Sequence, residues 1–138
     1  AIQSRESGSL PVAPAAAPPV VPEVVTLDPT MLDSFRSLRV PGQPDPVAEL
    51  VDLFLADLPN RLAALRFAVT EENLPAVKSA SHTLKGSASN VGGRRLAALC
   101  ADLELLAGNG STELSQQLQT VEAASRELQT ALEAEKLR

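Results

Sequence analysis

Apolar residues recur at helical spacing over most of this chain. From Val47 to Val69, an apolar side chain follows every three or four residues, which predicts a long amphipathic helix. Similar stripes run through the segments 74–91, 96–106 and 114–132. Each segment has one apolar stripe and a polar opposite face, so none of them can bury its stripe alone. We therefore expect four long helices that pack against one another.

Start and stop signals separate these stripes into elements. Asp28 and Asp45 each precede a proline, a pattern typical of a helix start. Asp28 opens a short helix and Asp45 opens the first long one, in which Pro59 is expected to cause a kink or a split. Gly92 and Gly93 interrupt the pattern later on. The sequence predicts an all-α protein, an antiparallel four-helix bundle over residues 27–138 with a short extra N-terminal helix.

Residues 1–26 have a different composition. Five of the eleven prolines of the chain lie between Pro11 and Pro22, interleaved with Ala and Val. Proline removes backbone donors and favours extended chain. We interpret residues 1–26 as a Pro/Ala-rich linker, with a proline-rich peptide ligand as the alternative.

Composition narrows the classes of function. The chain has 138 residues, no Trp or Tyr, and a net charge of −5, so we expect no nucleic-acid partner. Its single Cys excludes an intramolecular disulfide and a multi-cysteine metal site. No apolar run reaches the roughly 20 residues of a membrane span, and no signal peptide is evident. We expect a monomeric module in the cytoplasm, without direct membrane contact.

The only histidine, His82, lies on the polar face of the helix predicted over 74–91. At about 100° per residue, it is about 150° from the centre of the apolar stripe, so it is expected to be exposed. Lys85 and Gly86, three and four residues later, share this face, and Lys78 and Ser89 flank it. A glycine within a helix costs about 1 kcal/mol relative to alanine, so we infer that its missing side chain leaves room for a partner. A neutral imidazole beside a cation suits a group that accepts a phosphoryl unit.

The residues around this histidine form a motif. The core is His82-x-x-Lys85-Gly86, followed by Gly92 and, further on, by Leu103-Glu104. With these residues the chain resembles, from about residue 28 to 138, the histidine-containing phosphotransfer (HPt) domain of multistep phosphorelays. The resemblance implies a helical bundle whose histidine accepts a phosphoryl group from a receiver-domain aspartate and passes it to another receiver. It also implies a carrier with no ATP site, which is not itself an enzyme.

The resemblance implies roles for individual residues. His82 would be the phosphoacceptor, Lys85 the cation beside the phosphate and Gly86 the residue that gives clearance. Glu104 matches a position where members often have Gln or Glu, and would accept a hydrogen bond from the other ring nitrogen. The alternative for Glu104 is a solvated carboxylate. Ser89 and Lys78 are further supporting candidates. No metal site or cofactor of its own is expected, because the partner receiver domain would supply Mg²⁺.

The partners expected are response-regulator receiver domains. Leu53 lies about 130° from the apolar stripe of its helix, so it is a candidate docking residue, unless it is an ordinary exposed leucine. The proline-rich stretch before the bundle favours the C-terminal module of a hybrid sensor histidine kinase, cytoplasmic or part of a membrane-anchored protein. Two alternatives stay open: a bundle that docks receivers without phosphotransfer, and the phosphotransfer module of a chemotaxis-type kinase.

Overall fold

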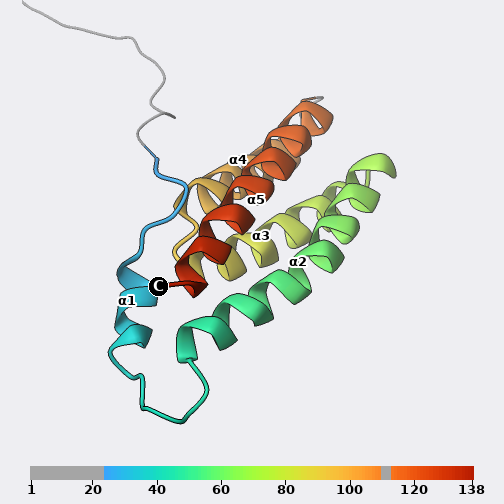
Figure 1. Cartoon of the computed structure of the whole chain (residues 1–138). Coiled ribbons are helices and arrows are strands. Elements are labelled where there is room, and N and C mark those ends of the chain that lie inside the picture. The colour runs from blue at the N-terminus through green and yellow to red at the C-terminus, as the bar shows by residue number, and fades with distance from the viewer. Residues whose placement is uncertain (1–23, 110–112) are drawn as a thin grey trace, which may run out of the picture.

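The computed structural model describes residues 24–109 and 113–138, which form five α-helices (Figure 1). They are α1 (Thr30–Arg36), α2 (Pro46–Thr70), α3 (Leu74–Asn90), α4 (Arg94–Gly108) and α5 (Leu114–Lys136). Each of the four long helices packs against the next, and α5 closes the bundle against α2. The short helix α1 lies beside one end (Figure 1). The described residues therefore form the all-α bundle with an extra N-terminal helix that the sequence predicts.

Side-chain caps fix where two of the long helices begin. The Asp45 carboxylate accepts a hydrogen bond from the backbone N–H of Val47 at 3.0 Å. The Asn73 side chain accepts one from the N–H of Ala76 at 3.2 Å. Each bond satisfies a backbone donor that has no partner within the helix. A proline follows each cap in the first turn, where its missing N–H is tolerated.

Helix α2 is continuous through Pro59, so the expected split is wrong. Pro59 is exposed, while Leu58 and Leu65 on either side of it are buried in the same core. Both halves of the helix thus bury one continuous stripe, and this packing outweighs the single backbone hydrogen bond that proline removes.

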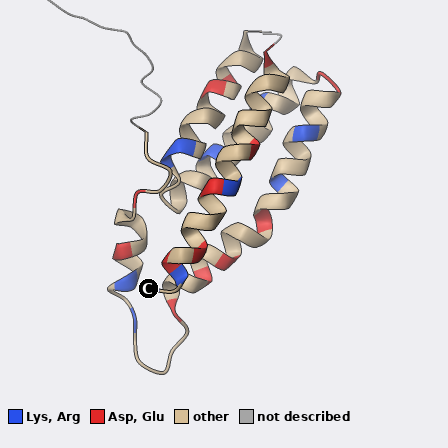
Figure 2. Cartoon of the chain, turned by 45° about the horizontal axis from the view of Figure 1, so that its top comes forward, with Lys and Arg blue, Asp and Glu red and all other residues tan. Residues whose placement is uncertain are grey.

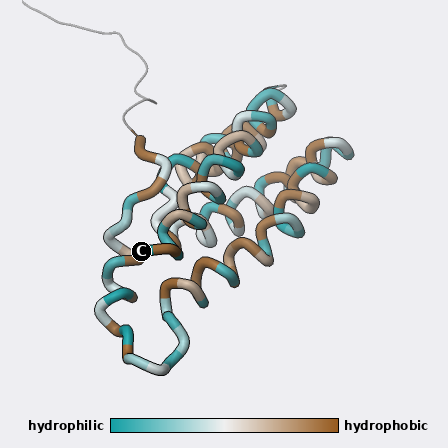
Figure 3. Tube along the Cα trace, viewed as in Figure 1, coloured by the Kyte–Doolittle hydropathy of each residue, from teal (hydrophilic) through white to brown (hydrophobic). Residues whose placement is uncertain are grey.

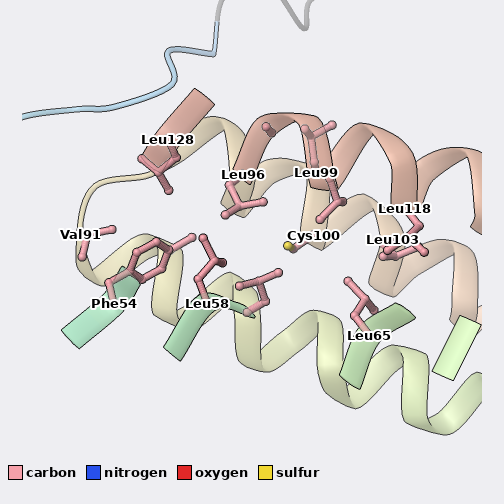
Figure 4. Packing of buried hydrophobic residues seen from close by; sticks show 14 of the residues in the cluster. Phe54, Leu58, Leu65, Val91, Leu96, Leu99, Cys100, Leu103, Leu118 and Leu128 are labelled. Carbon is pink, nitrogen blue, oxygen red and sulfur yellow. The ribbon is translucent and has the colours of Figure 1, made fainter. Parts of the chain in front are cut away.

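The apolar stripes of the helices meet in one core. Figure 3 shows hydrophobic and hydrophilic residues alternating along the long helices. In the close view of Figure 4, side chains from α2, α4 and α5 point toward one another. Two of the buried residues in the described ranges are polar, but the hydroxyls of Ser81 and Ser125 donate to the backbone oxygens of Val77 and Val121. The two serines therefore enter the core without an unpaired donor.

Residues 24–28, which we call the N-terminal strap, run along the turn between α3 and α4. The N–H of Asp28 donates to the oxygen of Gly92 at 2.8 Å, and the N–H of Arg95 donates to the oxygen of Val25 at 3.0 Å. Leu27 packs against the core. The hydrogen bond at Val25 lies two residues before the expected domain start at 27. Most of the predicted linker, residues 1–23, lies outside the described residues.

Gly92 allows this close approach of the strap. Its φ is +83°, in the left-handed region that favours glycine. A Cβ on Gly92 would lie 2.2 Å from the backbone oxygen of Asp28. The strap also carries an ion pair, because Arg94 lies 2.9 Å from the Asp28 carboxylate. Backbone contact and charge together join the strap to the start of α4.

Ion pairs hold α1 at the same end of the bundle as the turn between α3 and α4. Arg36 donates to the Glu135 carboxylate at 2.6 Å and to its backbone oxygen at 3.0 Å, so the end of α5 lies beside α1 (Figure 1). Arg39 makes two hydrogen bonds to Asp45. Elsewhere acidic and basic residues are interspersed along the helices (Figure 2). None of the helices formed by the described residues combines the length and the hydropathy that crossing a bilayer requires.

Candidate functional site

Helix α3 presents its only imidazole to solvent. The side chain of His82 is 67% exposed, while its neighbours Ser81 and Leu84 are fully buried. The inner stripe of α3 therefore faces the core and leaves His82 on the outer face, as the helical geometry predicts. Cap and core fix the rotation of the helix, and this rotation sets the direction of the imidazole.

Helix α4 brings a carboxylate to this imidazole. Glu104 Oε2 lies 3.3 Å from His82 Nδ1, and Glu104 Oε1 lies 3.0 Å from Lys85 Nζ. The Glu104 side chain is only 21% exposed, whereas a solvated surface carboxylate would be mostly open to water. We call these three residues the His82–Glu104–Lys85 cluster. The contact between Glu104 and His82, which the sequence left open, is present in the structure.

The cluster favours the ionised form of its carboxyl group. The hydrogen bond from Lys85 lowers the pKa of the Glu104 carboxyl below its ordinary value. The charge of Lys85 and the contact with His82 act in the same direction, against partial desolvation, which raises the pKa. Glu104 is therefore a carboxylate at neutral pH; it accepts a hydrogen bond from Lys85, and its other oxygen faces His82 Nδ1.

Gly86, one turn after His82, leaves the face beside the imidazole open. A Cβ at this position would meet no heavy atom of another element within 4 Å. The glycine is thus not required for helix packing, which is the ordinary reason for a glycine inside a helix. A second molecule can approach the imidazole over this turn.

The other candidates on α3 lie at different distances from the cluster. Lys78 is exposed, lies one turn before His82, and makes no ion pair within the described part of the chain. Ser89 is exposed but lies two turns beyond His82, about 10 Å along the helix axis. It lines a separate groove of about 400 Å³ together with Asp28 of the strap and Arg94 of α4. Ser89 is therefore not part of the cluster.

Leu53 lies on α2 and is 72% exposed. It lines a small groove of about 170 Å³ between α2 and α3 that also includes Ser87 and Asn90. Leu53 therefore borders α3 on the side where α2 packs, whereas Glu104 reaches His82 from α4. An approaching molecule that covers His82 from the α2 side would meet this leucine.

A larger groove, which the sequence reasoning missed, lies beside His82 between the same two helices. Its volume is about 440 Å³, and its lining includes Ser79 and Thr83 of α3. Two charged residues of α2, Asp57 and Arg61, also line it and form an ion pair with each other. The signal available in the sequence was their spacing of four residues on a helix face that otherwise carries small side chains.

The remaining reactive groups do not compete with His82. The Cys100 thiol is fully buried, and this burial raises its pKa to about 12, so it stays protonated. Residues 24–109 and 113–138 contain no group of three His, Cys, Asp or Glu side chains that could hold a metal ion. The described site therefore offers one exposed nucleophile, an adjacent cation and an open face.

Comparison with known proteins places this geometry in a family. Residues 49–136 match the family model of the Hpt domain. Among solved structures, histidine-containing phosphotransfer protein B from Pseudomonas aeruginosa is similar, with 25% sequence identity and a TM-score of 0.72 over 82% of this chain and 96% of that one. A putative histidine-containing phosphotransfer protein from rice shares the fold, with 21% identity, a TM-score of 0.68, and coverage of 78% and 79%. No match to a curated protein was found.

Proposed function

Because this chain belongs to the Hpt domain family, whose members are phosphotransfer carriers, we propose that His82 accepts a phosphoryl group from a receiver-domain aspartate and passes it to another receiver. The observation that carries the proposal is the His82–Glu104–Lys85 cluster on the open face of α3. A carrier needs an accessible nucleophile and positive charge near it, but it needs no nucleotide site of its own. A bundle that only docks receivers would not need the ion pair between Lys85 and Glu104 beside the imidazole.

The contact with Glu104 selects the reacting nitrogen. When Nδ1–H donates to the carboxylate, the lone pair of the neutral ring lies on Nε2, the nitrogen that does not face Glu104. Nε2 attacks the phosphorus of the aspartyl phosphate in line, and the bond between phosphorus and the aspartate oxygen breaks. The aspartate leaves as a carboxylate, and Nδ1 keeps its proton throughout.

The residues around His82 assist through charge and space. Lys85 offsets negative charge on the phosphoryl oxygens, and Gly86 leaves room for the receiver that carries the aspartate. Mg²⁺ held by the receiver would neutralise further phosphoryl charge. We assign no metal-binding role to this chain, and Lys78 contributes only to the local positive charge.

Docking of the receiver follows from the surfaces beside His82. We propose that the receiver covers the open face of α3 and the adjoining outer face of α2, with Leu53 as an apolar contact. The proline-rich stretch ahead of the bundle supports placing this domain as the C-terminal module of a hybrid sensor histidine kinase. A receiver domain encoded upstream of this sequence would support that placement, and a kinase domain downstream would contradict it.

The central test is His82→Gln. Because His82 is exposed, the variant should keep the helical fold and its melting temperature, yet accept no phosphoryl group from a phosphorylated receiver. Circular dichroism checks the fold, and single-turnover transfer of a radiolabelled phosphoryl group checks the activity. The label on the wild-type protein should be labile in acid and stable in alkali, as for a nitrogen–phosphorus bond. Transfer to a folded His82→Gln protein would overturn the proposal.

A further inference from the structure

Glu104 holds both groups that the proposed transfer requires. One carboxylate oxygen lies against His82 Nδ1 and the other against Lys85 Nζ, at 3.3 and 3.0 Å. The ammonium group is therefore already paired before any phosphoryl group arrives. Lys78, by contrast, has no ion-pair partner within the described part of the chain.

A phosphoryl group on His82 Nε2 would change this balance of charge. Two anionic groups, the phosphoryl oxygens and the Glu104 carboxylate, would then lie within reach of a single ammonium group. The ammonium group of Lys85 has three N–H donors and can contact both anions, but its single positive charge is then shared between them. The phosphoryl group therefore receives less of the attraction that would stabilise phosphohistidine than it would from an unpaired lysine.

We infer that Glu104 is a positioning residue that weakens the hold of His82 on its phosphoryl group by competing for Lys85, an inference that rests on the proposed function. The carboxylate also contacts Nδ1 of the ring. It keeps the proton on Nδ1 while phosphorus is bound to Nε2, so the ring leaves as neutral imidazole when the phosphoryl group moves to a receiver aspartate. The Nε2–phosphorus bond breaks, the aspartate oxygen–phosphorus bond forms, and no proton has to be supplied. A carboxylate at residue 104 thus favours transfer of the phosphoryl group to a receiver over its retention on His82.

The decisive variant is Glu104→Gln. The glutamine oxygen can still accept the hydrogen bond from Nδ1–H, but the side chain has no charge with which to hold Lys85. We expect the equilibrium with a phosphorylated receiver to shift toward phospho-His82 by about two- to fivefold, the range that partly exposed ion pairs set. Passage of the phosphoryl group from His82 to a receiver should slow. Asp102→Asn is the matched control, since it removes the same charge from an exposed position on α4 and should shift neither quantity.

A double-mutant cycle with Lys85→Ala tests the mechanism. If Glu104 acts by holding Lys85, Glu104→Gln should leave the equilibrium unchanged in the Lys85→Ala background. A shift of the same size in that background, or a shift away from phospho-His82 in the single variant, would overturn the inference. The ¹⁵N spectrum of His82 should show the proton on Nδ1 in wild type and in Glu104→Gln, which a general disruption of the site would not preserve.

The outcomes separate this inference from the proposed function. If the wild-type protein accepts no phosphoryl group, the proposed function fails and the inference fails with it. If the wild type is phosphorylated on His82 and Glu104→Gln behaves identically, only the inference fails. A shift toward phospho-His82 that requires Lys85 supports both.

Discussion

At the scale of single residues, His82 and Gly86 contribute little to the stability of the helix that carries them. His82 is mostly exposed, and Gly86 has the poorest helix propensity of any residue except proline. The packing of the core therefore does not explain why these two residues are present. The features of the site are an absent side chain, an exposed ring and a carboxylate from the next helix.

Gly86→Ala and Gly86→Leu should separate stability from transfer. A Cβ at this position enters open space, so the free energy of unfolding should rise by about 1 kcal/mol in both variants. In the proposed docking the receiver approaches over this turn, so transfer to His82 should slow, and more strongly for leucine. Denaturant melts and single-turnover assays on both variants measure the two effects. A destabilised Gly86→Ala protein would show that this position packs against another element.

The sequence predicts residue exposure better than residue contact. Counting 100° per residue was enough to place His82 and Leu53 on outer faces, because the apolar stripe of each helix sets its rotation. The ion pair between Lys85 and Glu104 was not predicted. It joins residues 19 positions apart, and their distance depends on how α4 turns back after Gly92.

At the scale of elements, the turn between α3 and α4 sets the register of the site. The turn places α4 so that Glu104 reaches His82, and the strap holds the turn through two backbone hydrogen bonds. The sequence predicts the helices from their stripes, but it could not predict the strap. Backbone hydrogen bonds at Val25 and Asp28 carry no side-chain pattern, and the composition around them resembles the linker.

Gly92→Ala should have the opposite effect on stability from Gly86→Ala. The positive φ disfavours alanine, and its Cβ would collide with the Asp28 backbone oxygen. We expect the free energy of unfolding to fall by about 1–3 kcal/mol. Thermal melts of Gly92→Ala and Gly86→Ala, side by side, make each variant the control for the other. Equal melting temperatures for the two proteins would contradict this account of the turn.

Two carboxylates near helix starts, Asp28 and Asp45, should make the free energy of unfolding depend on pH. Hydrogen bonds from Thr30 lower the pKa of Asp28, and a hydrogen bond from Arg39 lowers the pKa of Asp45. Because the folded pKa lies below the unfolded one, each group stabilises the fold above about pH 4 and loses this contribution as the pH falls further. The double variant Asp28→Asn/Asp45→Asn should therefore be less stable than wild type at pH 7. The difference in the free energy of unfolding should shrink as the pH falls.

The measurement for this prediction is a urea melt at several pH values between about 2 and 7. In Asp45→Asn the asparagine caps α2 about as well as aspartate, and in Asp28→Asn the amide oxygen can still accept the N–H of Thr30. Both substitutions therefore remove charge and keep a hydrogen-bond acceptor. Asp102→Asn corrects for the change in net charge. Stability curves that run parallel across the whole range would show that neither carboxylate is linked to folding.

At the scale of the whole molecule, the core and the site use opposite faces of the same helices. Leu84 and Leu103 are buried in the core, while His82 and Glu104 face outward or toward each other. The bundle was predictable because four amphipathic helices of similar length can bury their apolar stripes together in only a few arrangements. The sequence also predicted a kink or a split at Pro59, and the split does not occur, because local propensity is weaker than packing over the length of α2.

Two truncations should show how much the strap contributes. A chain that starts at residue 29 loses both backbone hydrogen bonds, the packing of Leu27 and the ion pair to Arg94. Compared with a chain that starts at residue 24, its free energy of unfolding should be lower by about 2 kcal/mol. Thermal melts of the two chains give the difference directly. Identical melting temperatures would mean that the strap lies on the bundle without stabilising it.

The buried thiol has a consequence for motion. Cys100 is the only cysteine of the chain and lies at the centre of the packing (Figure 4). An alkylating reagent can reach it only when α4 separates from its neighbours, so the labelling rate reports how often the bundle opens. Cys100 is thus a built-in probe of transient opening of the bundle. Comparing the labelling rate before and after phosphorylation would show whether charge added at the surface changes how often the core opens.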